Sequence, residues 1–288
     1  MNAATTTEIL RYSAFTTDPA GGNPAGVILD AAQLTGDQML AIAAEADYSE
    51  SAFITAADPS RRRFRLRYFS PLAEVAFCGH ATIATAVALA ERYGVGELAF
   101  DTAAGEIRVA TAAVDGAGAV RATLTSPPTH SRPAEGVEVD AALDALHWQR
   151  ADLDPALPPH VAFGGNHHLV LAAVSRARLA DLAYDFEALG GVMRAHDWTT
   201  VQLVWQESET DFHVRAPFPP GGVVEDPATG AAAAAFGGYL RTIGRVRSAT
   251  TLTLSQGADM GRPSTLTVNV DPTDPRVRVA GHAVPIVP

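Results

Sequence analysis

Short runs of β-branched and aromatic residues, many of them alternating with polar residues, occur along most of the chain. Such runs predict β-strands, because successive side chains on a strand face opposite sides of a sheet. Apolar residues at helical spacing predict fewer helices. The strands are predicted at Glu8–Phe15, Ala25–Leu29, Ser51–Thr55, Arg63–Phe69, Leu98–Thr102, Glu106–Ala110, Ala119–Thr125, His168–Val174, Thr200–Trp205, Phe212–Arg215, Thr251–Ser255, Thr265–Val270 and Arg276–Ala280. The helices are predicted at Gly36–Ala46, Ala81–Arg92, Asp140–His147, Arg178–Leu182, Phe186–His196 and Ala231–Ile243.

The predicted strands outnumber the helices about two to one and do not alternate strictly with them. This pattern favours an α+β fold with antiparallel or mixed sheets over a doubly wound nucleotide-binding fold. Loop-forming composition predicts a linker at Val114–Gly118 and a second loose stretch, rich in Pro and Ser, at Ser126–Glu138.

The two Ala-rich helices have similar surroundings, which indicates an internal repeat. Gly79 precedes the first helix and Gly105 follows it at almost the same spacing as Gly230 and Gly257 around the second. We therefore expect two similar domains, each a mixed or antiparallel sheet curled around one central Ala-rich helix. The expected boundaries are 1–118 with the C-terminal strand at about 276–288, and 119–275. Two facing domains leave a cleft, a common place for a ligand site.

Charge and composition exclude several classes of function. The formal net charge is −11, and all 21 basic residues are arginine. A chain without lysine cannot form the Schiff base of pyridoxal phosphate enzymes or of the corresponding aldolases. The acidic balance opposes general nucleic-acid binding. The one basic run, Arg61–Arg67, alternates with apolar residues and is typical of the solvated face of a strand.

The single cysteine, Cys78, excludes an intrachain disulfide and favours a cytoplasmic location. Met1–Leu10 has no positive charge before an apolar core and is not expected to be a signal peptide. The small-apolar stretches are about half the roughly 20 residues that cross a bilayer. We expect a soluble protein without a membrane partner.

Two segments carry the main candidates for acid/base and anion-binding chemistry in the first half. Glu50 stands at the start of an otherwise apolar strand, so its carboxyl is expected to be partly buried and suited to proton transfer; the alternative is a solvated carboxylate at a strand end. Cys78-Gly79-His80 opens the first Ala-rich helix, whose unpaired N–H groups favour an anion. Cys78 itself is typical of a small core residue, with a nucleophile as the alternative.

The opening of the second Ala-rich helix is a candidate anion-binding site for the same reason. Asp226 and Thr229 precede Gly230, where a ligand carboxylate can approach the backbone closely. The alternative is that Asp226 and Thr229 are ordinary helix caps and that His80 is a satisfied residue at a helix start.

Together these segments resemble the PhzF-like family (phenazine biosynthesis PhzF), within the diaminopimelate epimerase fold superfamily. The resemblance covers nearly the whole chain in family order, and the pieces Cys-Gly-His-Ala-Thr and Glu-Asp-Pro-Ala-Thr-Gly are specific. The matching positions are Phe15, Gly22–Pro24, Ser49–Glu50, Cys78–Thr82, Ala104–Gly105, Glu225–Gly230, Gln256–Gly257 and Gly261–Ser264.

The resemblance implies two domains of like fold with the site between them, a homodimer, and no metal or organic cofactor. The phenazine member of the family isomerises trans-2,3-dihydro-3-hydroxyanthranilate, and a glutamate there acts as base and then as acid. Carried over, the resemblance makes Glu50 that glutamate, with His80 and Asp226 as assisting catalytic residues. The candidate substrate-binding residues are Asn23, Ser49, Cys78, Gly79, Thr229, Gly230 and Ala231.

One departure from the family affects the expected substrate. Ala231 stands where the phenazine member has a serine, so a hydroxyl that could hold substrate is missing. The epimerase relatives use two opposed cysteines, and Thr229 occupies the second of those positions here.

We therefore expect a cofactor-independent isomerase that moves a proton on a small carboxylate-bearing substrate through a single Glu acid/base in the interdomain cleft. Two alternatives stay open: an epimerase or racemase that pairs Cys78 with Glu50, and a non-catalytic ligand-binding protein on the same scaffold.

Overall fold

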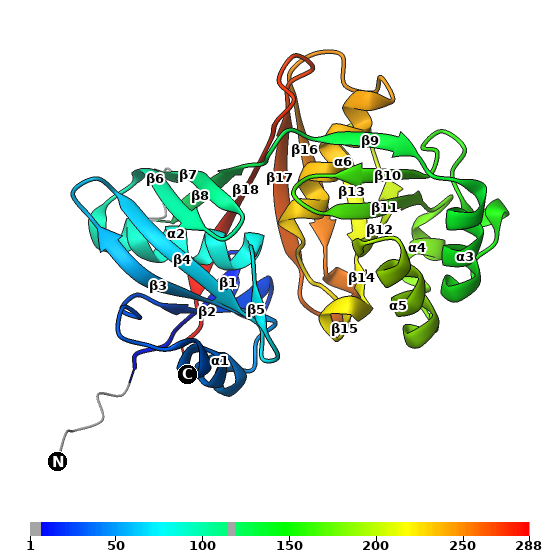
Figure 1. Ribbon diagram of the computed structural model, residues 1–288. Coiled ribbons are helices and arrows are strands. Elements are labelled where there is room, and N and C mark those ends of the chain that lie inside the picture. The colour runs from blue at the N-terminus through cyan, green and yellow to red at the C-terminus, as the bar shows by residue number, and fades with distance from the viewer. Residues whose placement is uncertain (1–6, 115–118, 288) are drawn as a thin grey trace. The chain divides into compact units, whose positions relative to one another are not determined.

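The computed structural model describes residues 7–114 and 119–287 (Figure 1). Residues 115–118 of the predicted linker, and with them the predicted boundary at residue 118, lie outside the described residues. The chain forms two compact units. Unit 1 lies within Met1–Leu124 and Gly281–Pro288, and unit 2 comprises Thr125–Ala280.

In unit 1 the strands form a closed ring. Hydrogen bonds connect them in the order β1-β2-β3-β4-β6-β7-β8-β18, and β18 also pairs with β1, where Tyr12 lies opposite Pro285. The elements of unit 1 are β1 (Leu10–Ala14), β2 (Asn23–Ile28), α1 (Gly36–Ala46), β3 (Glu50–Asp58), β4 (Arg63–Phe69), β5 (Glu74–Val75), α2 (Gly79–Tyr93), β6 (Gly96–Thr102), β7 (Gly105–Ala113), β8 (Val120–Thr125) and the end of β18 (Val277–Pro285).

Helix α2 occupies the middle of this ring (Figure 1). Every residue from His80 to Ala90 is buried, so the helix has no solvent face over that length. Alanine and threonine side chains allow strands to approach the helix from all sides, whereas larger residues would hold them away. The first turn of α2 is therefore held rigidly by the sheet around it.

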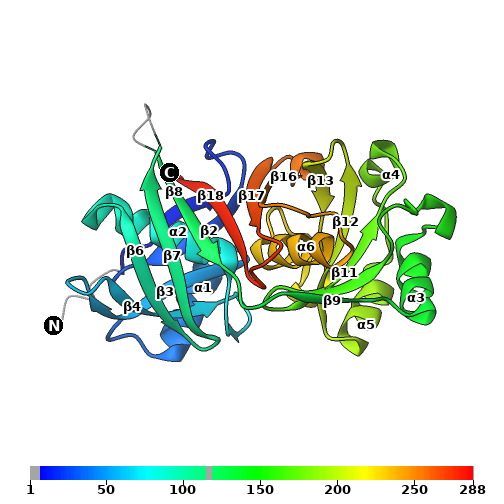
Figure 2. The same cartoon turned by 90° about the horizontal axis from the view of Figure 1, so that it is seen from above.

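Unit 2 is built around the second Ala-rich helix, α6, which Figure 2 shows among its strands. Its strand order is β9-β10-β11-β12-β13-β16-β17-β18. The elements of unit 2 are β9 (His130–Pro133), α3 (Gly136–Leu146), η1 (Arg150–Asp152), β10 (His160–Phe163), β11 (His167–Ala172), α4 (Arg176–Ala180), α5 (Phe186–Ala195), β12 (Trp198–Gln206), β13 (Asp211–Arg215), β14 (Pro217–Phe218), η2 (Pro219–Gly221), β15 (Val223–Glu225), α6 (Gly230–Thr242), β16 (Thr250–Gln256), η3 (Ala258–Met260), β17 (Ser264–Val270) and the start of β18.

Unit 2 also has an outer apolar core. Alternate residues of β11 and β12, such as Leu169 and Leu203, face away from α6 and pack against α3 and α5. The other face of the same strands turns toward α6. The structure is thus an α+β fold, as the pattern of predicted elements indicated.

The same order of strand pairings occurs in both units. The parallel pair β2–β3 corresponds to β11–β12, and β4–β6 corresponds to β13–β16. In each unit the Ala-rich helix lies in the chain between the strands of the second parallel pair. The sheet is mixed, in agreement with the expectation of antiparallel or mixed pairing.

The predicted loose stretch at Ser126–Glu138 was wrong in its second half. It contains the strand β9 and the start of α3, which begins at Gly136 rather than at the predicted Asp140. The strand β10 was also missed. Neither β9 nor β10 exceeds four residues, so alternation has too few positions to be recognised, and pairing with neighbours decides their conformation.

Within the described residues, no helix combines the length and the apolar character that crossing a membrane requires.

Replacing Gly238 of α6 with alanine is expected to lower the free energy of unfolding. A Cβ at this position would lie 2.6 Å from Thr129 Cβ and closer still to its hydroxyl oxygen, and overpacking of this kind costs about 1–3 kcal/mol. Gly191 of α5 is the matched control, because a Cβ there meets nothing within 4 Å. Gly191→Ala should be neutral or stabilise by up to about 1 kcal/mol. Urea unfolding measures both, and equal effects would contradict the packing of α6.

Candidate active site

Glu50 is the first residue of β3, next to Ala25 of the parallel strand β2. The residues after it, Ser51 to Ile54, are buried. The Glu50 side chain is only 15% exposed. The alternative of a fully solvated strand-end carboxylate is therefore wrong, and the carboxylate belongs to a partly buried cluster.

The opening of α2 supplies the residues next to Glu50. Cys78 is the N-cap residue in an extended conformation, and its side chain does not cap the helix. Its sulfur lies 3.4 Å from His80 Nδ1 and 3.7 Å from Glu50 Oε2. Both Cys78 and His80 are buried. Cys78 is thus a small buried residue, as its sequence context indicated, but it lies in contact with the candidate acid/base group.

His80 is held from two sides. Asn23 Nδ2 lies 3.1 Å from His80 Nδ1, and Ser49 Oγ lies 3.4 Å from His80 Nε2. Glu50 Oε2 lies 3.5 Å from the same Nε2. Because the Asn23 amide donates to Nδ1 in this arrangement, the neutral ring carries its proton on Nε2, facing Glu50 and Ser49.

Burial lowers the pKa of the His80 imidazole below its ordinary value, and the nearby Glu50 carboxylate opposes this shift. Desolvation disfavours the charged form of a histidine, so the imidazole is neutral at neutral pH. A neutral His80 offers Glu50 one N–H donor without a full positive charge beside it.

In unit 1 the structure thus brings together Glu50 and the first-half residues that the sequence singled out. These residues come from the start of β2, the residue before β3 and the opening of α2. They are Asn23, Ser49, Cys78, Gly79 and His80.

In unit 2 the predicted residues gather at the opening of α6. Thr229 is the N-cap residue, yet its hydroxyl does not cap the helix and instead donates to Asp226 Oδ2 at 2.6 Å. The Asp226 backbone N–H donates to Ala216 O. The alternative that Thr229 is an ordinary side-chain cap is wrong, and Gly230 and Ala231 form the first turn beyond it.

Gln256 is a member of this second cluster whose role was not predicted. Its Nε2 donates to Asp226 O at 2.8 Å and to Thr229 Oγ1 at 3.1 Å, while its Oε1 accepts from Thr229 N–H. Gln256 was visible only as part of the Gln256-Gly257 piece. Gly257 has φ +76°, and a Cβ there would lie 2.8 Å from Pro227 O, so glycine allows the two segments to meet.

A buried ion pair anchors the strand that leads into Asp226. Arg215 Nε donates to Glu225 Oε1 at 3.0 Å, and Nη2 donates to Oε2 at 2.5 Å. The side chains are 10% and 4% exposed. Alternation along β13 gave no signal for it, because Arg215 shares the face of His213 and lies opposite to the buried residues Phe212 and Val214.

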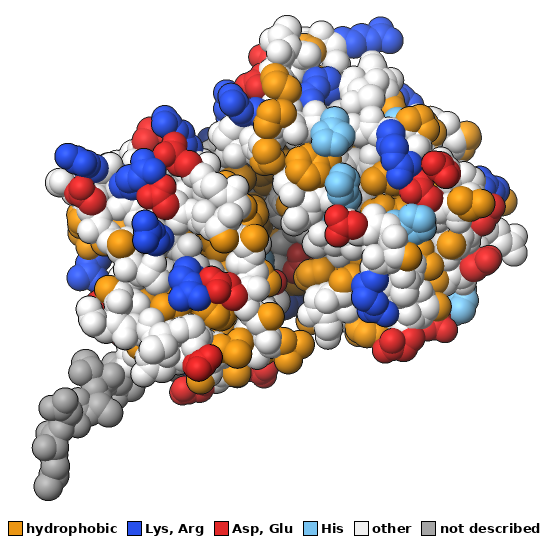
Figure 3. Space-filling model, viewed as in Figure 1, with side chains coloured by type: hydrophobic (Ala, Val, Ile, Leu, Met, Phe, Trp, Pro, Cys, Tyr) orange, Lys and Arg blue, Asp and Glu red, His pale blue; other side chains and the backbone are white. Residues whose placement is uncertain are grey.

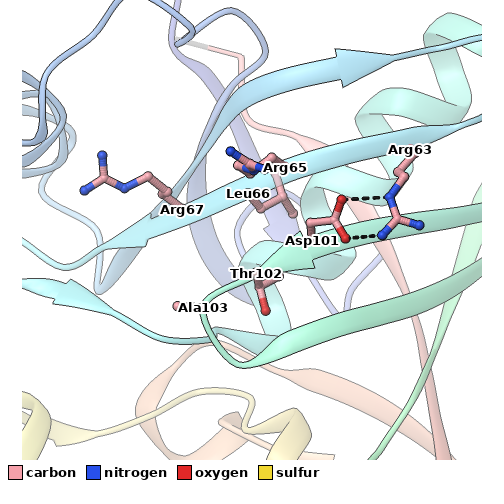
Figure 4. Close-up of a pocket in the computed structure, with 7 residues that line it drawn as sticks. All are labelled: Arg63, Arg65, Leu66, Arg67, Asp101, Thr102 and Ala103. Atoms are coloured by element: carbon pink, nitrogen blue, oxygen red, sulfur yellow. Dashed lines mark hydrogen bonds and ion pairs between the residues drawn. The ribbon is translucent and has the colours of Figure 1, made fainter.

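The arginine-rich strand β4 carries a hollow lined by Arg63, Arg65 and Arg67 with Asp101–Ala103 (Figure 4). Arg63 pairs with Asp101 and Glu106, and its hydrogen bonds to Asp101 hold the pKa of the Asp101 carboxyl below its ordinary value. Arg67 pairs with Glu74. Figure 3 shows arginines and carboxylates side by side on this surface. One face of β4 is thus charged and solvated, as the alternation of arginine with apolar residues predicted.

Comparison with known proteins places these features in a family. Residues 12–287 match the family described as phenazine biosynthesis-like protein (PhzC-PhzF). An uncharacterised isomerase of Escherichia coli K12 is 31% identical over 96% of this chain and 95% of its own. The trans-2,3-dihydro-3-hydroxyanthranilate isomerase of Pseudomonas chlororaphis is 29% identical, covering 94% of each chain. A phenazine biosynthesis protein of the PhzF family from Bacillus anthracis has a similar structure, with a TM-score of 0.85 and 25% identity over 97% of this chain and 96% of that one.

Proposed function

This chain belongs to the phenazine biosynthesis-like (PhzC-PhzF) family, and on that premise we propose that Glu50 moves a proton on a small carboxylate-bearing substrate. The relatives named as isomerases match almost the whole chain, and the protein is an isomerase. Its proposed reaction resembles that of the trans-2,3-dihydro-3-hydroxyanthranilate isomerase among those relatives.

The observation that carries the proposal is the contact between Glu50 Oε2 and His80 Nε2, with Asn23 behind the ring. In the proposed reaction Glu50 takes a proton from one substrate carbon and returns it to another. His80 orients the carboxylate through its Nε2–H and stays neutral. Acid–base catalysis of this kind supplies about 10²–10⁴-fold, and orientation of the substrate supplies the rest.

The helix openings are the proposed anion-binding groups. The first N–H groups of a helix have no partner within it, and they carry the positive end of the helix dipole. Neither Cys78 nor Thr229 caps its helix with its side chain, which supports binding of a substrate carboxylate at the N–H groups near Gly79 and near Gly230. Asp226, held by Thr229, is the proposed assisting group of unit 2.

The distance between Cys78 and Glu50 argues against the epimerase alternative. A two-base epimerase holds its acid and its base on opposite faces of one carbon, so that the substrate lies between them. Cys78 Sγ and Glu50 Oε2 are 3.7 Å apart, in direct contact. A substrate carbon does not fit between two groups in contact, and this supports a single shuttling carboxylate.

The position of the transferred proton tests this proposal. Thermal-shift screening against small cyclic amino and hydroxy acids, beginning with trans-2,3-dihydro-3-hydroxyanthranilate, identifies a ligand that is turned over. Turnover in D₂O followed by NMR should show hydrogen at a different carbon of the product, with less than one deuterium per turnover early in the reaction if Glu50 is shielded from water. Inversion at a single carbon with full deuterium uptake would overturn the one-carboxylate shuttle.

Cys78→Ser is expected to keep measurable turnover, with kcat/KM reduced less than about tenfold. The reason is that Thr229 occupies the place of a second thiol, so Cys78 contributes contact rather than proton transfer. Steady-state kinetics of Cys78→Ser and Cys78→Ala on the same ligand measure this. Complete loss of turnover in both variants, each folded by circular dichroism, would favour the epimerase alternative.

The domain duplication, the oligomeric state, the cofactor requirement and the cellular location of the protein remain predictions. The matching pairing orders of the two units support two related domains of one duplicated fold, each wrapped around its Ala-rich helix. The homodimer and the absence of a required cofactor come from the family resemblance, and the cytoplasmic location comes from the single cysteine.

A further inference from the structure

Glu50, Cys78 and His80 present three different metal-binding atoms to one another. Cys78 Sγ lies 3.7 Å from Glu50 Oε2 and 3.7 Å from His80 Nε2. His80 Nε2 and Glu50 Oε2 are 3.5 Å apart. Among the described residues, this is the group of histidine, cysteine and carboxylate ligands whose donor atoms converge closely enough to share one ion.

These distances are those between the ligands of a tetrahedral zinc ion. With Zn–S near 2.3 Å and Zn–N and Zn–O near 2.0–2.2 Å, tetrahedral angles separate sulfur from nitrogen or oxygen by about 3.5–3.7 Å. The same geometry separates nitrogen from oxygen by about 3.3–3.5 Å. The separations between the three donor atoms therefore match three corners of a tetrahedron. Cys78 Sγ lies nearer to His80 Nδ1, at 3.4 Å, than to Nε2, at 3.7 Å, so the imidazole must turn to bring its Nε2 lone pair toward the ion. The fourth corner is left for water or a ligand atom.

The charge and burial of the three donors suit a divalent ion. A thiolate and a carboxylate together balance a charge of +2, and cysteine, histidine and carboxylate are the ligands that zinc takes in proteins. Binding forms a metal–sulfur bond and releases the thiol proton to the buffer. The side chains of His80 and Glu50 are 6% and 15% exposed, so little water competes at the site.

Asn23 supplies the outer partner that a metal-binding histidine needs. The amide now lies 3.1 Å from His80 Nδ1. A half-turn of that amide presents Oδ1 to the Nδ1–H, which leaves Nε2 unprotonated and able to bind the ion. Such outer partners fix the ring and raise metal affinity, and their loss costs about 10–100-fold.

We propose that Glu50, Cys78 and His80 bind one thiophilic divalent cation, such as Zn²⁺, which inhibits the protein. The cation is an inhibitor rather than a cofactor, because it takes the carboxylate and the imidazole that proton transfer requires. Binding of the cation stands independently of the reaction, whereas the inhibition rests on the proposed function of Glu50.

Co²⁺ is the probe for the site, because its spectrum reports both sulfur ligation and tetrahedral geometry. The chelator-treated full-length protein, kept reduced, is titrated with Co²⁺ in the absence of substrate. We expect one equivalent to bind with a thiolate-to-metal charge-transfer band and intense tetrahedral bands, and Zn²⁺ to displace it. X-ray absorption of the Zn²⁺ form should show one sulfur among lighter ligands.

Three variants test the site: one changes a ligand, one changes the outer partner of His80, and one is a control. Cys78→Ser should abolish the charge-transfer band, and Asn23→Leu should weaken binding about 10–100-fold while keeping that band. His213→Gln is the control, because His213 and Glu207 form an exposed pair elsewhere and should not affect the tight equivalent. Circular dichroism checks that each variant is folded.

Absence of Co²⁺ binding would overturn the proposal. So would Co²⁺ binding that shows no thiolate band and is as tight in Cys78→Ser as in the wild type. Neither outcome changes the proposed proton transfer, because the titration contains no substrate. Conversely, full turnover by the metal-free Glu50→Gln variant would refute the proposed function and would leave the proposed metal site unaffected.

Discussion

Glu50→Gln is expected to lower kcat by about 10²–10⁴-fold, while ligand binding and the folded state stay nearly unchanged. Glutamine keeps the size of the side chain and its contact with His80, but it cannot accept the proton from the substrate carbon. The loss should therefore appear in kcat rather than in KM, because the missing interaction acts in the transition state. Rates come from steady-state NMR assays, and ligand binding from thermal shift.

Two variants test the specificity of this effect. Glu97→Gln removes an exposed carboxylate of β6 in the same unit and should leave kcat and stability unchanged. Glu50→Asp keeps the carboxylate but draws it back from His80 Nε2 and from the substrate, so it should retain part of the activity. Wild-type turnover in Glu50→Gln would remove Glu50 from the mechanism.

Arg215→Met is expected to lower the free energy of unfolding by about 3–5 kcal/mol. The substitution leaves the Glu225 carboxylate, only 4% exposed, without the guanidinium that donates to both of its oxygens. It also removes the donor to Ala180 O at 2.8 Å, which ties β13 to the end of α4. A charge left unpaired in a buried place has lost its hydration without compensation, and this makes the effect large.

A double variant and an exposed pair serve as controls. Arg215→Met combined with Glu225→Leu should recover much of the lost stability, because an apolar pair leaves no buried charge behind. Asp140→Ala breaks the pair between Arg150 and Asp140, whose side chains are more than half exposed, and should change stability by less than about 1 kcal/mol. Chemical denaturation measures all three. Similar small effects for the buried and the exposed pair would contradict the buried ion pair.

Local pattern was enough to predict several features of this protein from its sequence. The alternation at Arg63–Phe69 predicted a strand with one charged face, and β4 has those bounds. The run of small residues after Gly79 predicted a helix buried on all sides, and α2 is buried throughout its middle. Both predictions rest on neighbours along the chain, where side-chain periodicity and residue size determine which faces are covered.

The sequence by itself also determined the local setting of the candidate site: a carboxylate at a strand start, and Cys78 and His80 at a helix opening. Only the tertiary structure decided that these groups touch. The parallel register of β2 with β3 carries Asn23 toward His80, and the ring of strands sets α2 against the start of β3. In the same way Gln256 meets Asp226 and Thr229 from a distant strand. The physical reason is that strand register and helix packing depend on contacts between segments far apart in the chain, whereas periodicity records only which side of each segment is covered.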